Sequence, residues 1–285
     1  YQVIDDGSSD NTAKVAKKLG VHHIIQFKKN RGLGTGFKHG VTNAIIQWAD
    51  ILVNTDADNQ YPGKYIEKLV RPIVLGQAEI VVGNRQPTKT PHFSPTKRFF
   101  QRLGNQVVST ITREPIPDAV SGFRAYSREA LYELNVTTRF SYVLDTIIQA
   151  YKKGLKIQWV KIRTNPPTRP SRLFRNIFEH MQKSTVNILR VYTMYEPLKV
   201  FMALSIPSLL LGSLWIARFF YFYLFSGSGD GRIQSLILSA ILITIGITLF
   251  ALGILGDVLA KNRMLMEQQM SLLKRLESFD SSDKS

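Results

Sequence analysis

The sequence contains no cysteine, and it has only 5 histidines among its 285 residues. Disulfides, thiolate metal sites and a cysteine nucleophile are therefore excluded, and nothing in the composition indicates an oxidising compartment. Long apolar runs are absent from residues 1–197, so this part has the composition of a soluble protein. Acidic residues are also scarce there, because residues 1–197 hold 29 Lys and Arg against 15 Asp and Glu.

This excess, a net charge of about +14, indicates an anionic partner for residues 1–197. Nucleic acid, anionic lipid headgroups and phosphorylated substrates would all suit it. The basic residues are not interleaved with aromatic residues in the pattern that stacks single-stranded bases. Together with the apolar C-terminal third, this distribution favours lipid and phosphorylated ligands over nucleic acid.

An acidic turn follows the short aliphatic run at residues 51–53. Such a run is typical of a buried parallel strand, and ligands of open α/β sheets bind beyond the carboxyl ends of the strands. Asp56 and Asp58 are two residues apart, so both carboxylates face the same side of an extended chain. Mg²⁺ and Mn²⁺ prefer carboxylate and phosphate oxygens. The pattern therefore indicates a metal site for a diphosphate, although an acidic turn after a strand is more often only solvated.

Strands and helices alternate in the first half of the chain. We expect strands at residues 3–4, 24–25, 51–53, 79–82 and 157–162, and helices at 37–48, 64–75 and 141–151. Residues 30–36 have the composition of a glycine-rich loop, but they match neither a P-loop nor a dinucleotide fingerprint. The alternation predicts a mostly parallel sheet with helices on both faces. Because the chain begins within a strand, we expect that an N-terminal strand is missing.

Two apolar runs, residues 200–225 and 233–256, are long enough to cross a membrane as helices. The first would span about 39 Å at ~1.5 Å per residue, more than the ~30 Å hydrocarbon core. A short Gly/Ser turn joins the two runs, so both ends of the hairpin lie on one side, and that side carries nearly all the Lys and Arg. The positive-inside rule therefore predicts an integral membrane protein whose soluble part lies on the cytoplasmic face.

The segments that flank the two runs permit alternatives. Residues 166–197 place basic and apolar residues at helical spacing, which is typical of a helix at a membrane surface and also of an amphipathic helix packed on a core. After residue 258, a helical stretch contains Leu265, Leu272, Leu273 and Leu276. These leucines favour self-association into a homo-oligomer, and a frayed tail is the equal alternative.

Five segments follow one another along the chain at residues 5–12, 30–34, 56–60, 82–85 and 121–124. In this order they resemble the motifs of glycosyltransferase family 2. The likeness covers residues 1–197 and extends to the membrane-anchored polyprenyl-phosphate and dolichol-phosphate glycosyltransferases, which include dolichol-phosphate mannose synthases. It implies the GT-A fold, a Rossmann-like α/β architecture. It also implies inverting transfer of a sugar from a UDP- or GDP-sugar to undecaprenyl or dolichyl phosphate, with Mg²⁺ or Mn²⁺ as cofactor.

The resemblance also implies roles for individual residues. Asp56 and Asp58 would be catalytic and, with Gln60, would hold the metal. Asp145 would orient the donor sugar, unless it is simply a charge on a helix surface. The residues that would bind the nucleotide-sugar donor are Asp5, Asp6, Asn30, Gly32 and Arg85. Those that would bind the acceptor phosphate are Lys97, Arg98, Gln101, Arg124, Arg169 and Arg172, although Arg124 could instead form a structural ion pair. An isoprenoid phosphate is already an anionic nucleophile, so the reaction needs no strong general base.

On this basis we expect a catalytic domain at residues 1–165, juxtamembrane helices at 166–197, two transmembrane helices within 198–257 and a cytoplasmic tail at 258–285. Two features depart from the family pattern: its first strand is absent, and residues 168–172 replace the Gly-X-Ser-Lys segment of mannose synthases, which weakens the case for a GDP-mannose donor.

Two other functions compete. A polysaccharide synthase would need a Gln-X-X-Arg-Trp motif and more spans, and a non-catalytic membrane scaffold would not need the acidic and basic residues.

Overall fold

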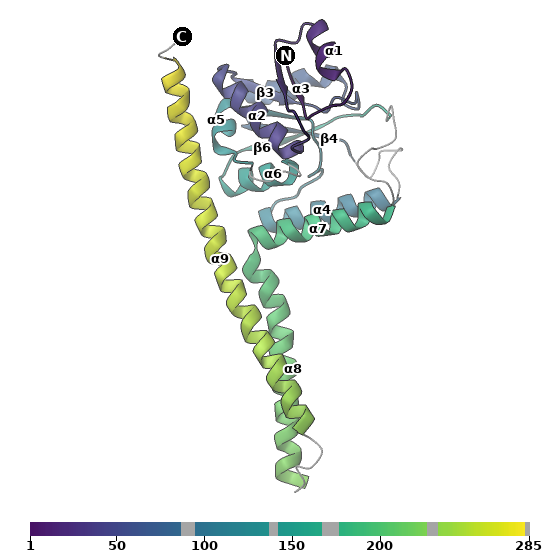
Figure 1. Ribbon diagram of the computed structural model, residues 1–285, viewed down its shortest axis with the longest axis vertical. Helices are drawn as coiled ribbons and strands as arrows, with labels where there is room; N and C mark the ends of the chain where they lie inside the picture. The colour runs from purple at the N-terminus through teal and green to yellow at the C-terminus, as the bar shows by residue number, and fades with distance from the viewer. Residues whose placement is uncertain (87–94, 137–141, 167–176, 227–232, 283–285) are drawn as a thin grey trace. The chain divides into compact units, whose positions relative to one another are not determined.

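The computed structural model describes residues 1–86, 95–136, 142–166, 177–226 and 233–282 (Figure 1). The chain divides into two compact units, one formed by Tyr1–Ile188 with Met266–Ser285 and the other by Leu189–Leu265. The elements are β1 (Gln2–Asp5), α1 (Thr12–Lys18), β2 (His23–Gln26), α2 (Leu33–Ile46), β3 (Ile51–Asn54), the 3₁₀ helix η1 (Gly63–Tyr65), α3 (Ile66–Val74), β4 (Ile80–Asn84), α4 (Pro95–Thr112), β5 (Arg124–Ser127), α5 (Arg128–Glu133), α6 (Val143–Lys152), β6 (Ile157–Lys161), α7 (Ile177–Tyr195), α8 (Pro197–Ser226) and α9 (Ile233–Ser282).

The strands of the first unit form two sheets. β1 and β2 pair in parallel, and the other four strands form a sheet of order β3-β5-β4-β6. β4 and β6 are parallel, whereas β5 is antiparallel to both of its neighbours. β5 begins where β3 and β4 approach their ends, since Arg124 lies opposite Asn54 and Val82, and it then runs back along them. The predicted parallel direction therefore holds for β3, β4 and β6, whose carboxyl ends share one edge, and β5 is the exception.

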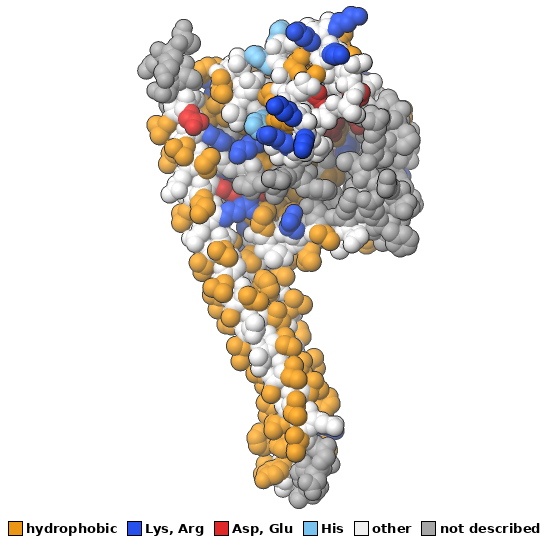
Figure 2. All heavy atoms as spheres, viewed as in Figure 1, with side chains coloured by type: hydrophobic (Ala, Val, Ile, Leu, Met, Phe, Trp, Pro, Cys, Tyr) orange, Lys and Arg blue, Asp and Glu red, His pale blue; other side chains and the backbone are white. Residues whose placement is uncertain are grey.

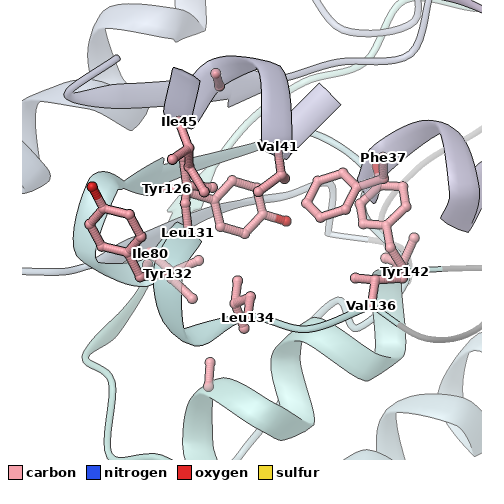
Figure 3. Packing of buried hydrophobic residues seen from close by; sticks show 14 of the residues in the cluster. Phe37, Val41, Ile45, Ile80, Tyr126, Leu131, Tyr132, Leu134, Val136 and Tyr142 are labelled. Carbon is pink, nitrogen blue, oxygen red and sulfur yellow. The ribbon is translucent and has the colours of Figure 1, made fainter. Parts of the chain in front are cut away.

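Apolar side chains cover both faces of the four-stranded sheet. Side chains of successive strand residues point to opposite faces, so Ile80 and Val82 join one buried cluster and Val81 joins the other. The first cluster includes residues of α2, α5 and α6, and Figure 3 shows its aromatic rings, among which Phe37 stacks on Tyr142 at 4.0 Å between centroids. The second cluster includes residues of η1 and α3. Helices thus lie on both faces, as the sequence predicted.

Helix α2 begins at Leu33, earlier than the predicted residue 37, so Gly34 and Gly36 are helical and not part of a loop. The glycines of this helix allow it to lie close to β1. A Cβ on Gly40 would be 2.6 Å from Ile4 Cδ1, and one on Gly36 would be 3.3 Å from Ile4 Cγ2. The glycine-rich composition that suggested a loop therefore serves the packing of a helix on a strand.

The second unit contains α8 and the first part of α9. Two helical stretches, Pro197–Phe225 and Ile233–Ser278, are long and apolar enough to cross a membrane, and hydrophobic side chains predominate on the visible surface of α8 and of the first part of α9 in Figure 2. The two helices touch through small residues. A Cβ on Gly246 would be 2.6 Å from the Leu209 side chain, and Ser205 Oγ donates a hydrogen bond to Gly246 O at 2.7 Å. Small residues at such contacts are typical of helix pairs in membranes.

The end of α9 belongs to the first unit and packs on α5. Lys274 Nζ donates hydrogen bonds to the backbone oxygens of Leu131 (3.2 Å) and Leu134 (2.5 Å). Arg275 forms ion pairs with Glu129 at 2.8 Å and Glu133 at 3.1 Å. Helix α9 continues to Ser282, so the alternative of a frayed tail is wrong for the described part of residues 258–285.

Candidate active site

The acidic turn between β3 and η1 is held by its own backbone and by the segment after β6. Gln60 donates its N–H to Asp58 Oδ1 at 3.0 Å, which closes a local turn. Asn59 has a φ of 59°, in the left-handed region that asparagine tolerates better than most residues. Asn165 donates its side-chain N–H to Asn59 O and its backbone N–H to Gln60 O. The turn that carries the two predicted metal ligands therefore has a defined conformation.

Asp56 has a raised pKa. The largest cause is desolvation by nearby protein atoms, although the residue is exposed to solvent. The neighbouring charge of Asp58 raises this pKa further, while Arg85 and Arg124 act in the opposite direction. Two close carboxylates are more stable when a cation lies between them, so the site favours a bound positive ion.

The residues at the turn fit a divalent ion that is completed by a substrate. No group of three or more His, Cys, Asp or Glu side chains suited to a metal occurs in the part of the chain that the structure describes. Asp56 and Asp58 nevertheless supply hard oxygen ligands, and the amide of Gln60 is of a compatible type. Mg²⁺ is usually bound by one or two carboxylates together with substrate phosphates and water. The chemistry of the donor set therefore fits Mg²⁺ or Mn²⁺ on a diphosphate.

Two side chains that the sequence did not single out, Asn54 and Tyr61, lie on either side of the acidic turn in the chain, and both bind Gly122. Asn54 Nδ2 donates hydrogen bonds to Gly122 O at 2.9 Å and to Tyr142 Oη at 2.6 Å. Gly122 donates its N–H to Tyr61 Oη at 3.2 Å. These bonds attach the acidic turn to the segment before β5. No short sequence signal could have found them, because the partners are more than 60 positions apart.

Arg85 is held by Asp118, another residue to which sequence reasoning gave no role. Its Nε and Nη2 atoms each donate to an Asp118 carboxylate oxygen at 2.8 Å, and its backbone N–H donates at 2.9 Å. The exposed fractions of the two side chains are 9% and 0%. Burial acts to lower the pKa of Arg85, but the hydrogen bonds and charge of Asp118 outweigh it and raise that pKa, so the guanidinium stays charged. Arg85 also acts electrostatically on Asp56, so its charge lies close to the predicted metal site.

The environment of Arg124 does not fit the prediction that this residue binds the acceptor phosphate. Its side chain is 0% exposed, and its guanidinium donates to Ser121 O, Ala119 O, Val143 O and Thr146 Oγ1 at distances from 2.7 to 3.0 Å. The acceptors are backbone and hydroxyl oxygens, so these bonds are not the structural ion pair considered as the alternative. A guanidinium without solvent access cannot meet a phosphate in this structure. Arg124 instead ties the start of α6 to the segment before β5.

Asp6 lies at the predicted donor edge, where it binds the backbone before α2. Its carboxylate accepts the N–H groups of Arg31 at 2.7 Å and Gly32 at 3.0 Å. Gly7 allows this approach, because a Cβ there would be 2.6 Å from the backbone of the neighbouring segment. Asn30 is exposed beside these residues. The structure therefore brings Asp6, Asn30 and Gly32 together, and their role in binding the donor stays a prediction.

Asp5 and Asp145 are both buried, at 2% exposure each. Asp5 accepts hydrogen bonds from the Ser8 N–H at 2.8 Å and from Gln26 Nε2 at 3.1 Å, which makes it a structural residue of its loop. Asp145 lies in the first turn of α6, where a negative charge is favourable for the helix dipole. The alternative of a helix-surface charge is therefore wrong for Asp145, and its role towards a sugar stays a prediction.

The predicted acceptor-phosphate residues are only partly placed. Arg98 and Gln101 lie on α4, and Gln101 is buried, with an Oε1 atom that accepts no hydrogen bond within the described ranges. The side chain of Lys97 and all of Arg169 and Arg172 lie outside the described residues. Their grouping around a phosphate therefore stays a prediction.

The chain is similar in sequence and in fold to known glycosyltransferases. A UDP-N-acetylglucosamine–dolichyl-phosphate N-acetylglucosaminyltransferase of Methanococcus voltae is 31% identical over 185 residues, which cover 57% of this chain and 73% of that protein. The glycosyltransferase AglJ of Haloferax volcanii is 25% identical over 283 residues, covering 96% of this chain and 88% of the relative. A crystal structure of glucosyl-3-phosphoglycerate synthase from Mycobacterium tuberculosis with Mn²⁺, UDP and glucosyl-3-phosphoglycerate has the same fold, with a TM-score of 0.52, 17% identity and 67% coverage of each chain. The GT-A-like α/β fold predicted from the sequence is thereby confirmed. The model of glycosyl transferase family 2 matches residues 2–134, and the chain belongs to this family of sugar-transferring enzymes.

Proposed function

We propose that this protein is a membrane-anchored, metal-dependent inverting glycosyltransferase that moves a sugar from a UDP- or GDP-sugar to a polyprenyl phosphate. The observation that carries the proposal is the pair Asp56 and Asp58, which stand beyond the end of β3 close enough to interact: desolvation, and after it the like charge of Asp58, raises the pKa of Asp56. The name of the Methanococcus voltae relative supports a dolichyl-phosphate acceptor and a UDP-linked donor. The crystal structure with Mn²⁺ and UDP supports the use of a divalent metal.

The chemistry follows from the residues of the site. Asp56, Asp58 and the amide of Gln60 would hold Mg²⁺ or Mn²⁺, which as a Lewis acid stabilises the negative charge that develops on the leaving nucleotide. Arg85 remains cationic next to these carboxylates and adds positive charge at the same place. A polyprenyl phosphate attacks the anomeric carbon with an oxygen that is already anionic, so the protein must orient the acceptor and does not need to deprotonate it. In-line attack inverts the anomeric configuration.

The membrane part of the proposal rests on α8 and α9. Both helices satisfy the length and composition of a membrane span, and their contact through Gly246 and Ser205 suits two helices that pack in lipid. The Lys and Arg residues are concentrated outside the two apolar runs, which supports a cytoplasmic position for the catalytic part. We accordingly retain a catalytic domain at residues 1–165, juxtamembrane helices at 166–197, the hairpin within 198–257 and a cytoplasmic tail at 258–285.

A donor panel tests the function directly. The full chain in detergent is incubated with undecaprenyl or dolichyl phosphate, Mn²⁺ or Mg²⁺ and labelled UDP- and GDP-sugars, and lipid-extractable label is counted. We expect transfer from at least one donor that is abolished by a chelator and restored by Mn²⁺. If no donor labels either lipid, the transferase assignment is wrong, and a scaffold that retains the fold becomes the better explanation.

A pair of substitutions tests the metal assignment. Asp58→Asn removes one predicted ligand, and activity should fall by about 100-fold or more, because the leaving group then loses much of its electrostatic stabilisation. Asp50→Asn is the matched control, since Asp50 lies at the opposite end of β3 with a side chain that is 92% exposed. Equal activity of the two variants would contradict the assignment of Asp58 to the metal.

A further inference from the structure

Gly122 contacts the acidic turn and the residues on either side of it through its N–H group, its carbonyl oxygen and its Cα atom. Its N–H donates to Tyr61 Oη at 3.2 Å, and its carbonyl oxygen accepts from Asn54 Nδ2 at 2.9 Å. Between these two contacts lies Asp56: a Cβ placed on Gly122 would be 2.9 Å from Asp56 Oδ2 and 3.2 Å from Oδ1. The carboxylate of Asp56 therefore occupies the space that any side chain at position 122 would take.

Gly122 is fixed from the other side as well. Its neighbour Phe123 accepts the N–H of Gly83 at 2.9 Å, and the Phe123 ring stacks on that of Tyr61 at 5.2 Å between centroids. On the preceding residue, Ser121 O accepts a hydrogen bond from the buried Arg124 guanidinium at 2.7 Å. The segment cannot move away easily, so an atom added to Gly122 has to displace the Asp56 carboxylate.

Backbone conformation does not explain the glycine. Gly122 is not among the glycines with a left-handed φ, in contrast to Gly7 and Gly32, so an alanine could adopt its backbone angles. The group that an alanine Cβ would meet is the end of a side chain that can rotate, which makes the substitution tolerable for the fold. The effect of a Cβ at position 122 should therefore fall on the position of Asp56 and not on folding.

We propose that Gly122 is a positioning residue for Asp56: the absence of a side chain at position 122 fixes where the Asp56 carboxylate stands for the divalent metal. This inference rests on the proposed function, in which Asp56 binds that metal. An alanine Cβ would have to be about 0.5 Å farther from Asp56 Oδ2 to reach an ordinary 3.4 Å contact. Metal–ligand distances tolerate only about 0.2 Å, so the displaced carboxylate would be a poor ligand.

Mn²⁺ binding tests the proposal without relying on turnover. The electron paramagnetic resonance signal of free Mn²⁺ is followed during titration of the full-length protein in detergent, with UDP or GDP present. Gly122→Ala should weaken Mn²⁺ binding by about 10- to 100-fold, the usual effect of disturbing the partner of a metal ligand. Gly104→Ala is the control, because a Cβ there meets nothing within 4 Å, and Mn²⁺ binding should be unchanged. Unchanged Mn²⁺ binding in Gly122→Ala would overturn the proposal.

A double-mutant cycle separates this proposal from the proposed function. If Gly122 acts through Asp56, Gly122→Ala should cause no further loss of Mn²⁺ binding in an Asp56→Asn background. An additional loss there would show that Gly122 acts on something else and would overturn the inference. If Asp56→Asn alone leaves Mn²⁺ binding intact, the metal site is wrong, whereas loss in Asp56→Asn with none in Gly122→Ala refutes only the positioning role.

Tyr61→Phe keeps the proposal testable if Gly122→Ala does not fold, which thermal unfolding would show. This change removes the oxygen that accepts the Gly122 N–H and keeps the ring that stacks on Phe123. We expect a smaller loss of Mn²⁺ affinity than for Gly122→Ala, and the loss should disappear in the Asp56→Asn background. Mn²⁺ affinity equal to that of the unmodified protein would contradict the role of Gly122.

Discussion

Replacing Asp118 by asparagine should destabilise the first unit strongly. The substitution keeps the shape of the side chain and removes the charge that accepts two side-chain hydrogen bonds and one backbone hydrogen bond from Arg85. Asp118 is 0% exposed, so the Arg85 cation loses the carboxylate that it is hydrogen-bonded to in a site that water hardly reaches. Breaking a buried ion pair on one side costs about 3–5 kcal/mol. At about 2–4 °C per kcal/mol, the midpoint of thermal unfolding should fall by roughly 10 °C.

The exposed pair between Asp50 and Arg128 provides the control. Its nitrogen–oxygen distance is 3.0 Å, close to that of the buried pair, but the Asp50 side chain is 92% exposed. An exposed pair contributes about 0–1 kcal/mol, so Asp50→Asn should hardly move the unfolding midpoint measured by circular dichroism in detergent. If Asp118→Asn lowers the unfolding midpoint no more than Asp50→Asn does, burial does not determine how much these ion pairs contribute to stability, and the reasoning is refuted. The double variant Arg85→Met with Asp118→Leu should recover much of the stability without recovering activity, because it removes both charges together.

Two other perturbations test the packing of the first unit. Burial, followed by the charges of Lys153 and Lys38, lowers the pKa of Lys274 to about 8 from 10.5. At a pH between these two pKa values, Lys274 is protonated in the unfolded chain and neutral in the folded chain, so the free energy of unfolding should rise from pH 8 to pH 10. This rise should be smaller in Lys274→Met. If thermal unfolding shows the same pH dependence of stability in both proteins, the assignment to Lys274 is contradicted. Gly40→Ala places a Cβ 2.6 Å from Ile4 Cδ1 and 2.9 Å from Gln2 Nε2, and it should cost about 1–3 kcal/mol of unfolding free energy. Adding Ile4→Ala removes the closer of these two contacts, so the change Gly40→Ala should cost less in that background. A single Gly40→Ala variant as stable as the unmodified protein would show that α2 can move away from β1.

Elements with a clear local pattern were predictable from the sequence. The aliphatic run before Asp56 forms β3, the two apolar runs form long helices, and the predicted strands and helices occur in the expected order, whereas α5 was not predicted. The start of α2 was not predictable, since Gly34 and Gly36 have low helix propensity. Gly36, like Gly40 later in the helix, lies where a side chain would meet Ile4 on β1. Such a contact joins segments distant in the sequence, so no local window contains it.

The candidate site shows the same division between local pattern and tertiary contact. Asp56 and Asp58 are found from their spacing after a strand, because the alternation of a strand is itself local. Arg124 was expected to reach a phosphate because the resemblance to the family gave it that role. Its partners are carbonyl and hydroxyl oxygens of segments that meet only in the folded chain, and these bury it completely. Asp118 has no local signal at all, because its role depends on Arg85 at the end of another strand.

The end of α9 shows that the pattern of leucines does not reveal which side of a helix packs on its own chain. The leucines at 272, 273 and 276 are exposed, whereas Ser271 and Ser278 are buried against the first unit. Helix α5 ends in this region, and the last carbonyl groups of any helix lack partners within that helix. Lys274 supplies the missing donor to Leu131 O and Leu134 O, and Ser278 accepts a hydrogen bond from the Tyr132 hydroxyl at 3.0 Å. Hydrogen bonds to the end of α5, and not the pattern of leucines, thus determine which side of α9 packs on α5.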